Sequence, residues 1–482
     1  MSTEAAAKSH VIWPASRREF LAQAGAGFGG LALGSMMGWD DARAEVPDID
    51  PLNPLGQRVP HFAPKAKSVI FLFMEGGPSH IDLFDPKPAL ERWSGKPLPP
   101  SIGPVFTPMG VGGNTLMPSS RKFAQHGESG LWVSDWYPHV AKVADEICLI
   151  RSCYCDGINH VGSVCQMNTG SILAGRPSLG AWVSYGLGTE NANLPSFVVM
   201  SDAGDPLGGA RNWGTGWMPA TFQGTPFRRD GSPILYLQPP KGSDQELQQR
   251  KLQGITDLDR LHLEGREEDT RLAARIAAYE LAYKMQAEAP ETVDLSTETA
   301  ETKLLYGLDD DRTRTYGTMC LRARRLVERG VRFVQCYSGS GSQWDAHGDM
   351  EENHGRLCPR SDKPVSALIQ DLKRRGLLET TLVIWGGEFG RTPMNEKTKG
   401  RDHNPYGFSM FMAGGGVKAG LTFGATDEFG LKAIEGRVHV HDIHATILHQ
   451  LGLDHKRLTF PRDGRDERLT VNGGRVIKEI LA

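Results

Sequence analysis

Two segments of the chain have the pattern of a helix that ends at a glycine and leads into a buried strand. The segment "TYGTMCLRARRLVERG" ends at Gly330 and is followed by the apolar run "RFVQCY" (332–337). The segment "DKPVSALIQDLKRRG" ends at Gly376, shortly before "TLVIWG" (381–386). Glycine commonly ends a helix because it adopts the left-handed conformation without strain, and a short unbroken apolar run is typical of a strand buried on both faces. These units predict an α/β domain.

Three more apolar runs extend the predicted sheet, and one region departs from the pattern. The runs are "SVIFLFM" (68–74), "SFVVM" (196–200) and "FSMFMAG" (408–414). Residues 242–303 are instead charged and helical in pattern, so we expect a helical insertion packed on the α/β core. Its apolar stripe consists of Leu272, Ile276, Tyr279 and Tyr283. Residues 67–482 are expected to form one domain that includes this insertion.

The first 44 residues have the features of an export signal. Arg17 and Arg18 precede a weakly apolar, Gly/Ala-rich stretch, and "ARAE" (42–45) has the pattern of a signal-peptidase site. This order resembles a bacterial twin-arginine signal; a chance arginine pair before a short apolar helix is the alternative. We expect residues 1–44 to be removed and the Pro-rich residues 45–66 to form a linker. The mature protein is then expected to be periplasmic or secreted, with no integral membrane segment.

The net charge and the cysteines exclude several classes of protein. The net charge is −3 at pH 7, so no overall field attracts the protein to nucleic acid or to an anionic membrane. The seven cysteines include no C-x-x-C motif and no four-cysteine zinc spacing. Because seven is an odd number, at least one thiol stays outside any intramolecular disulfide. Buried free cysteines are the expectation.

Three clusters of acids and histidines follow predicted strands. They are Glu75, His80, Asp82 and Asp85; then Asp345, His347 and Asp349; then Glu388 and Arg391, with Asp402 and His403 further on. Ligands of open α/β sheets gather beyond the carboxyl ends of the strands, and carboxylates and imidazoles from separate strands form mixed sites for divalent metals. Each cluster alone also has a structural explanation in helix caps, turns or a Glu388–Arg391 ion pair.

Taken together, the motifs identify the sequence as similar to a bacterial family, the domain of unknown function 1501 (DUF1501), within the alkaline phosphatase/sulfatase superfamily. The motifs are "FLFMEGGPSHIDLFDPKP", "QMNTGSILAGRPSLGAWVSYGLG", "NLPSFVVM", "WDAHGD", "VIWGGEFGRTP", "GRDHNP" and "GRDERLT". The resemblance implies a mixed, largely parallel sheet sandwiched by helices. It also implies one or two divalent metals (Ca, Mg, Mn or Zn) beside a nucleophile, and a helix within 439–454 with Asp442 as its N-cap.

The resemblance also implies roles for individual residues. The predicted metal ligands are Glu75, His80, Asp82, Asp345, His347, Glu388 and His403. Glu388 takes the acidic position of a sulfatase segment, but Phe389 takes the next position, where a ligand is expected. His403 precedes its strand, so the loop before it is expected to fold back over the sheet edge. Arg391 is predicted either to neutralise Glu388 or to bind an anionic ester.

Cys165 and Thr169 are the candidate nucleophiles. In sulfatases the cysteine of C-x-P-S-R is converted to formylglycine. In "CQMNTGSILAGR" Cys165 lies ten residues before Gly175, as in sulfatases, but Met167 replaces the proline and Thr169 the arginine. Conversion is therefore not expected. A free Cys165 thiolate or Thr169 remains as the nucleophile, and a buried structural cysteine is the alternative.

The resulting hypothesis is a periplasmic, metal-dependent hydrolase of sulfate or phosphate esters that lacks the formylglycine motif. Its substrate would be a small anionic ester or a sulfated or phosphorylated glycan, and no nucleic-acid partner is expected. The alternative is a non-catalytic scaffold of the same superfamily that binds a glycan or a protein. Phe389 and the missing motif favour the scaffold, whereas the retained acids and histidines favour the enzyme.

Overall fold

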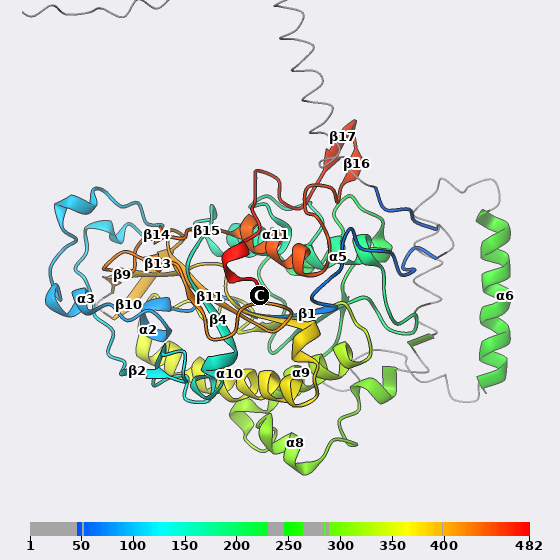
Figure 1. The fold of residues 1–482 in the computed structure, drawn as a ribbon, viewed down its shortest axis with the longest axis horizontal. Helices are drawn as coiled ribbons and strands as arrows, with labels where there is room; N and C mark the ends of the chain where they lie inside the picture. The colour runs from blue at the N-terminus through cyan, green and yellow to red at the C-terminus, as the bar shows by residue number, and fades with distance from the viewer. Residues whose placement is uncertain are drawn as a thin grey trace, which may run out of the picture. The chain divides into compact units, whose positions relative to one another are not determined.

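The structure is a computed structural model that describes residues 46–50, 53–229, 245–263, 281, 284–285, 289–397 and 399–482 (Figure 1). Two predictions lie outside these residues. One is the signal peptide (1–44) with its arginine pair, and the other is the apolar stripe of the insertion (Leu272, Ile276, Tyr279 and Tyr283).

A nine-stranded sheet forms the centre of the domain. Eight strands follow the order β12-β4-β11-β8-β1-β7-β5-β6, and β15 pairs with β4. The strands are β1 (Ser68–Met74), β4 (Ile147–Tyr154), β5 (Phe197–Ser201), β6 (Thr225–Pro226), β7 (Phe333–Ser338), β8 (Thr381–Gly386), β11 (Phe408–Ala413), β12 (Thr422–Phe423) and β15 (Val438–His439). β5, β7, β1 and β8 are parallel, whereas β11 is antiparallel to both β8 and β4. The sheet is therefore mixed and largely parallel, as the sequence resemblance implies.

All five strands predicted from the apolar runs are present, each within one residue of its predicted bounds. The sequence did not predict β4. Arg151 interrupts its apolar pattern, and this side chain is only partly buried, with its Nη1 3.5 Å from Asp85 Oδ1. A strand with a charged residue in its middle does not stand out as an apolar run.

Helices cover both faces of the sheet (Figure 1). α9 (Asp311–Glu328) and α10 (Met350–Arg374) share one buried core with alternate residues of β1, among them Leu72. α4 (His160–Thr169), α5 (Leu179–Leu187) and α11 (Val440–Gln450) share a second core with the intervening β1 residues, among them Phe71. Every residue of β1 is buried, because successive side chains point to opposite layers.

The ends of the predicted helices agree with the structure, with one correction. α9 and α10 end shortly before Gly330 and Gly376, whose φ values are 85° and 68°, so both glycines adopt the left-handed conformation that was predicted. The predicted N-cap of α11, Asp442, is wrong. His439 is the N-cap, and Asp442 accepts the His439 N–H at 2.9 Å from inside the first turn, as the acid of a capping box does.

The remaining elements are short, apart from one helix in the predicted insertion. They are α2 (His80–Leu83), α3 (Pro88–Arg92), α6 (Gln245–Leu263) and α8 (Ala300–Leu305), and the two-stranded sheets of β2 (Phe123–His126) with β3 (Leu131–Ser134), β9 (Gly390–Glu396) with β10 (Gly400–Asn404), β13 (Ala425–Thr426) with β14 (Ala433–Glu435), and β16 (Phe460–Arg462) with β17 (Arg465–Glu467). α6 lies inside 242–303, where the sequence predicts helix.

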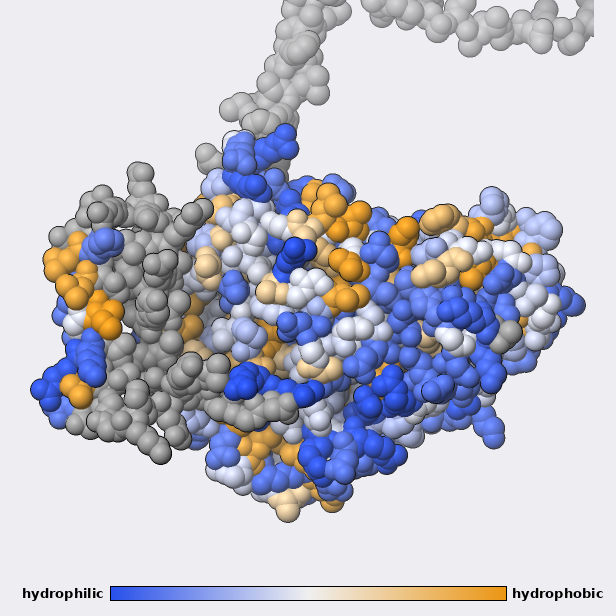
Figure 2. All heavy atoms as spheres, turned by 180° about the vertical axis from the view of Figure 1, so that it is seen from behind, coloured by the Kyte–Doolittle hydropathy of each residue, from blue (hydrophilic) through white to orange (hydrophobic). Residues whose placement is uncertain are grey.

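The face of the molecule shown in Figure 2 is mostly hydrophilic in its described part. Seen from the side opposite to Figure 1, hydrophobic side chains form several separate groups among hydrophilic ones (Figure 2). In the part of the chain that the structure describes, no helix is long and apolar enough to cross a membrane.

Candidate metal centre

One edge of the sheet collects residues from several strands. β11 is antiparallel to both β4 and β8, so β4 runs in the same direction as β1, β7 and β8, and all four strands end at this edge. β11 begins at the same edge because it runs the opposite way. The residues that follow the four strands or precede β11 include Glu75, His160, Asp345, His347, Glu388 and His403. The reversed direction of β11 therefore accounts for the position of His403.

The hairpin of β9 and β10 supplies further side chains to this edge. Arg391 on β9 lies directly opposite His403 on β10. Side chains at paired positions of antiparallel strands are close neighbours. Glu396 is the last residue of β9. The short connection from β8 thus brings a guanidinium, a carboxylate and an imidazole to one place.

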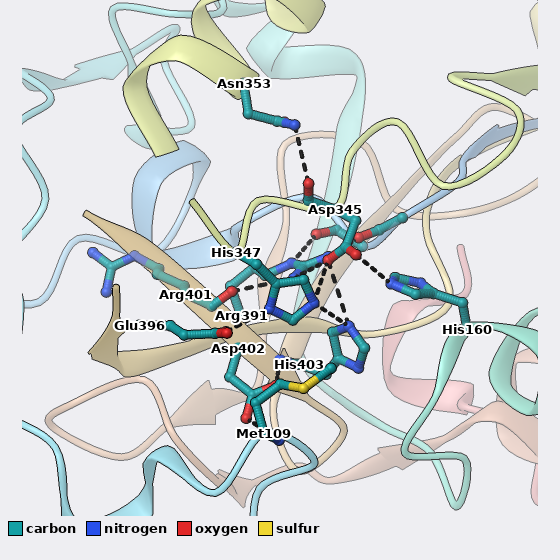
Figure 3. A network of polar contacts seen from close by, with 12 residues as sticks. Met109, His160, Asp345, His347, Asn353, Arg391, Glu396, Arg401, Asp402 and His403 are labelled. Atoms are coloured by element: carbon teal, nitrogen blue, oxygen red, sulfur yellow. Dashed lines mark hydrogen bonds and ion pairs between the residues drawn. The ribbon is translucent and has the colours of Figure 1, made fainter. Parts of the chain in front are cut away.

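The Asp345 carboxylate lies at the centre of the site (Figure 3). Its Oδ2 lies 3.2 Å from His160 Nε2, and its Oδ1 lies 2.9 Å from His347 Nε2 and 3.4 Å from His403 Nε2. The Nε2 atoms of His347 and His403 are 3.0 Å apart. One ligand atom from each of the four residues lies within 4.8 Å of the others. Atoms that share one metal ion at about 2.0–2.2 Å have a comparable spacing.

An oxygen acceptor holds the other ring nitrogen of each histidine. Nδ1 lies 2.6 Å from Glu388 Oε1 in His160, 2.5 Å from Glu396 Oε2 in His347 and 3.1 Å from the Ile158 carbonyl oxygen in His403. Such an acceptor keeps the proton on Nδ1 and leaves the lone pair on Nε2, as in metal-binding histidines. Three Nε2 lone pairs beside a carboxylate repel one another unless a cation or protons lie between them.

The pKa values of His160 and Asp345 show that positive charge is favoured beside the Asp345 carboxylate. Burial lowers the pKa of His160, but hydrogen bonds to Asp345 and Glu388 outweigh it and raise the pKa to about 9. Burial raises the pKa of Asp345, but hydrogen bonds from His160, His347 and His403 hold that pKa well below its usual range. At neutral pH His160 therefore carries a proton that a metal ion has to displace.

Arg391 is fully buried and fixes the position of Asp345. Its Nη1 lies 2.7 Å from Asp345 Oδ1 and donates to the Arg401 carbonyl oxygen at 3.2 Å. Its Nε donates to Gly77 O at 2.8 Å, and its Nη2 donates to Gly76 O. Arg391 thus pairs with Asp345 instead of Glu388. Its predicted contact with an anionic ester stays a prediction.

Glu388 and Glu75 lie beside the four-residue group and not within it. Glu388 accepts the Gly76 N–H at 3.0 and 3.1 Å with its two oxygens, in addition to holding His160. The Glu75 carboxylate accepts N–H groups of Leu207 at 2.6 Å and Gly341 at 3.0 Å. Burial and the neighbouring Glu388 carboxylate raise the pKa of Glu75 to about 7, against the opposing effect of the Leu207 hydrogen bond.

A second set of ligand atoms adjoins the first. His347, Glu396 and Asp402 also place one ligand atom each within 4.8 Å of one another. Asp402 accepts N–H groups of Met109 at 2.8 Å and His403 at 2.7 Å. Glu396 is already hydrogen bonded to His347 Nδ1, and Asp402 accepts two backbone N–H groups. We therefore interpret both carboxylates as supports of the Asp345 cluster and not as a second metal site.

His80 and Asp82 lie outside both sets among the described residues. His80 Nε2 lies 2.7 Å from Gly430 O. Asp82 forms a buried ion pair with Arg401, with Oδ2 2.9 Å from Arg401 Nε. The structure therefore gives both residues partners other than the Asp345 cluster, and their predicted roles as ligands stay predictions.

Cys165 and Thr169 lie in α4, the helix that begins at His160. The Cys165 Sγ is 3.5 Å from Thr169 Oγ1, which in turn donates to the Cys165 carbonyl oxygen at 2.8 Å. Burial raises the pKa of the Cys165 thiol, so the thiol form is favoured over the thiolate. All seven cysteines are buried and free, as expected.

The sequence analysis missed His160 and Glu396. His160 follows β4 in "CDGINHVGS", where Asn159 caps α4 by accepting the Gly162 N–H at 3.0 Å. A prediction of β4 would have exposed His160 as a polar residue after a strand. Glu396 gives no comparable signal, because its pairing with His347 depends on the β9–β10 hairpin.

Phe389 forms an apolar wall of the site. Its ring stacks on His403 with 4.5 Å between centroids and lies 4.9 Å from the His160 ring. The side chain is buried. Phe389 therefore restricts the movement of His160 and His403. It occupies the position where the family resemblance implies a metal ligand.

The model of a family described as "Protein of unknown function (DUF1501)" matches residues 66–481. No curated protein matches the sequence significantly.

Three solved structures with low similarity to the chain are described as proteins of different function. The lipoteichoic acid synthase LtaP from Listeria monocytogenes has 10% identity, with 87% of this chain and 79% of that chain covered and a TM-score of 0.37. The alkaline phosphatase from the Antarctic bacterium TAB5 has 10% identity, coverage of 82% and 100%, and a TM-score of 0.33. The sulfatase PsFucS1 from Pseudoalteromonas sp. has 13% identity, coverage of 85% and 74%, and a TM-score of 0.31. At these sequence identities and TM-scores, the similarity assigns no reaction to the chain.

Proposed function

Since the chain belongs to the DUF1501 family, which is described as of unknown function, its activity has to be inferred from the site, and we propose that it is a metal-dependent hydrolase of phosphate or sulfate esters. The observation that carries the proposal is the orientation of three imidazoles. Each Nδ1 is held by an oxygen, and each Nε2 points to the Asp345 carboxylate.

The donor set fits a divalent metal ion. Asp345, His160, His347 and His403 would hold it, with three nitrogen donors and one carboxylate. Among Ca²⁺, Mg²⁺, Mn²⁺ and Zn²⁺ this set favours Zn²⁺, because imidazole suits zinc whereas calcium and magnesium take oxygen ligands. When bound, such an ion supplies positive charge that polarises an ester oxygen and acidifies a bound water.

The charges of the site explain why an anionic ester requires the ion. Asp345, Glu388 and Glu396 place three carboxylates around the histidines, against the positive charges of Arg391 and of protonated His160. This excess repels an anionic ester. The Asp345 and His347 side chains are 24% and 18% exposed, so the cluster is open to solvent on their side.

Water is the nucleophile that the site favours. Cys165 is a buried thiol hydrogen bonded to Thr169, and Thr169 donates to a helix carbonyl. Neither group has a histidine or carboxylate partner to remove its proton, among the contacts that the described residues make. The reaction is then the addition of water to the phosphorus or sulfur centre with release of the alcohol.

Hydrolysis assays test the proposal. Protein stripped with a chelator should not hydrolyse 4-nitrophenyl phosphate or 4-nitrophenyl sulfate. Reloading with Zn²⁺ should restore hydrolysis of at least one ester, and Ca²⁺ or Mg²⁺ should restore less. Tight binding of the ion without turnover of either ester would contradict the hydrolase and favour the non-catalytic scaffold.

The periplasmic location is part of the proposal. It depends on Arg17 and Arg18, which lie outside the described residues. Changing both to lysine should leave the precursor in the cytoplasm, because the twin-arginine receptor reads the pair. Fractionation and immunoblotting measure this result, and an undiminished periplasmic amount would refute the location.

A further inference from the structure

A pocket lined by four arginines lies at the end of β5, apart from the Asp345 cluster. Its volume is about 180 Å³, room for about six water molecules at about 30 Å³ each. Its lining residues are Met200, Ser201, Phe227, Arg228, Arg229, Arg314, Thr315, Thr318, Met319 and Arg322. These residues include no aspartate or glutamate. The pocket therefore combines four positive charges with three hydroxyl groups.

Arg322 of α9 has no hydrogen-bond or ion-pair partner among the described residues. Its Nε is buried without a hydrogen-bond acceptor, and no ion pair joins its guanidinium to a described residue. Burial lowers its pKa, and no nearby carboxylate opposes this effect. A partly buried charge without a partner is costly. By contrast, Arg314 on the same helix pairs with Asp311 and donates to Leu308 O.

The pocket lies at the same edge of the sheet as the Asp345 cluster. β5 is parallel to β7, so it ends at the same edge. Of the α9 residues that line the pocket, all but Arg322 lie in the first half of the helix, away from its connection to β7. The Ser201 Oγ in the pocket lies 2.6 Å from Ser340 Oγ, and the next residue, Gly341, donates its N–H to Glu75 at 3.0 Å. β5 pairs with β7, the strand that Asp345 follows.

We infer that this pocket binds a second phosphate or sulfate group of the substrate, so that the substrate is a polyanion with at least two anionic groups. The planar guanidinium of arginine binds tetrahedral oxyanions through paired N–H donors, and Thr315 and Thr318 add hydroxyl donors. The identification of this group as part of the substrate rests on the proposed hydrolase function. The binding of an oxyanion in the pocket does not.

Calorimetry with inorganic phosphate and sulfate on the metal-free, full-length chain tests the pocket directly. One anion should bind per chain, and Arg322→Gln should weaken it about tenfold or more. Asp345→Asn should leave this binding unchanged, because Asp345 belongs to the other site. No anion binding by the unchanged protein, or equal binding by Arg322→Gln, would overturn the inference.

Arg312→Gln is the matched control. Arg312 is also on α9, is 73% exposed and pairs with Asp310 outside the pocket. The Arg312→Gln protein should bind phosphate and sulfate as tightly as the unchanged protein does. On the loaded enzyme, Arg322→Gln should raise KM for an ester with a second anionic group and leave KM for 4-nitrophenyl esters unchanged. If no ester is hydrolysed at all, the proposed function is refuted. Calorimetry would still show whether the pocket binds an anion.

Discussion

Replacing Asp345 with asparagine should abolish metal binding and reduce ester hydrolysis by about a thousandfold. The change removes the one charged ligand on which three imidazoles converge. A metal ion contributes several kcal/mol to stabilising a transition state, and each 1.36 kcal/mol corresponds to a factor of ten in rate. The measurements are the metal content and the rate with a 4-nitrophenyl ester under saturating Zn²⁺.

Two further variants separate loss of the metal from loss of the fold. His347→Gln removes a ligand whose side chain is 18% exposed, so it should lose the metal with less effect on stability. Asp463→Asn is the matched control, because Asp463 is 83% exposed and has a positive φ that asparagine tolerates. Hydrolysis at the unchanged rate in folded Asp345→Asn would exclude the proposed centre.

Replacing Arg391 with methionine should lower the free energy of unfolding by about 3–5 kcal/mol. Removing one member of a buried ion pair leaves an uncompensated buried charge, which typically costs this amount. Here the loss leaves the carbonyl groups of Gly76, Gly77 and Arg401 without this donor and removes the permanent positive charge beside Asp345. Urea unfolding in the absence of metal gives the free energy.

Arg374→Met is the control for this measurement. Arg374 is 50% exposed, and its ion pairs with Glu301 and Asp371 are 3.5 and 3.7 Å long. Exposed pairs contribute about 0–1 kcal/mol, so this change should have little effect. If Arg391→Met and Arg374→Met have the same free energy of unfolding, Arg391 does not stabilise the fold through its contacts.

The largely parallel core was predictable because its strands are buried on both faces. Strands such as β1 are buried at every position and apolar at all but the first. They are followed by polar residues, so both the elements and their order are evident from the sequence. β4 was not predicted, because Arg151 lies in its middle and interrupts the apolar pattern. With β4 unrecognised, His160 was missed as well, although it contacts both Asp345 and Glu388.

Strand direction also explains which of the predicted metal ligands come together. Asp345, His347 and His403 do converge, because strand direction brings them to one edge. Glu388 is present but holds His160 instead. Whether a carboxylate faces the cluster or orients a histidine depends on a difference of a few ångströms, which the residue order does not determine. Asp82 illustrates the point, since its partner Arg401 is 319 residues away.

The metal content of the purified protein decides whether the Asp345 cluster is a metal centre. The full-length chain should be produced in a bacterial host with a functional twin-arginine pathway, purified from the periplasm without chelators, and examined by elemental analysis beside the Asp345→Asn variant. The account predicts about one divalent ion per chain, with zinc favoured, and background levels in the variant. Background levels of every divalent metal in the unchanged protein, before and after incubation with Zn²⁺ and Mn²⁺, would contradict it.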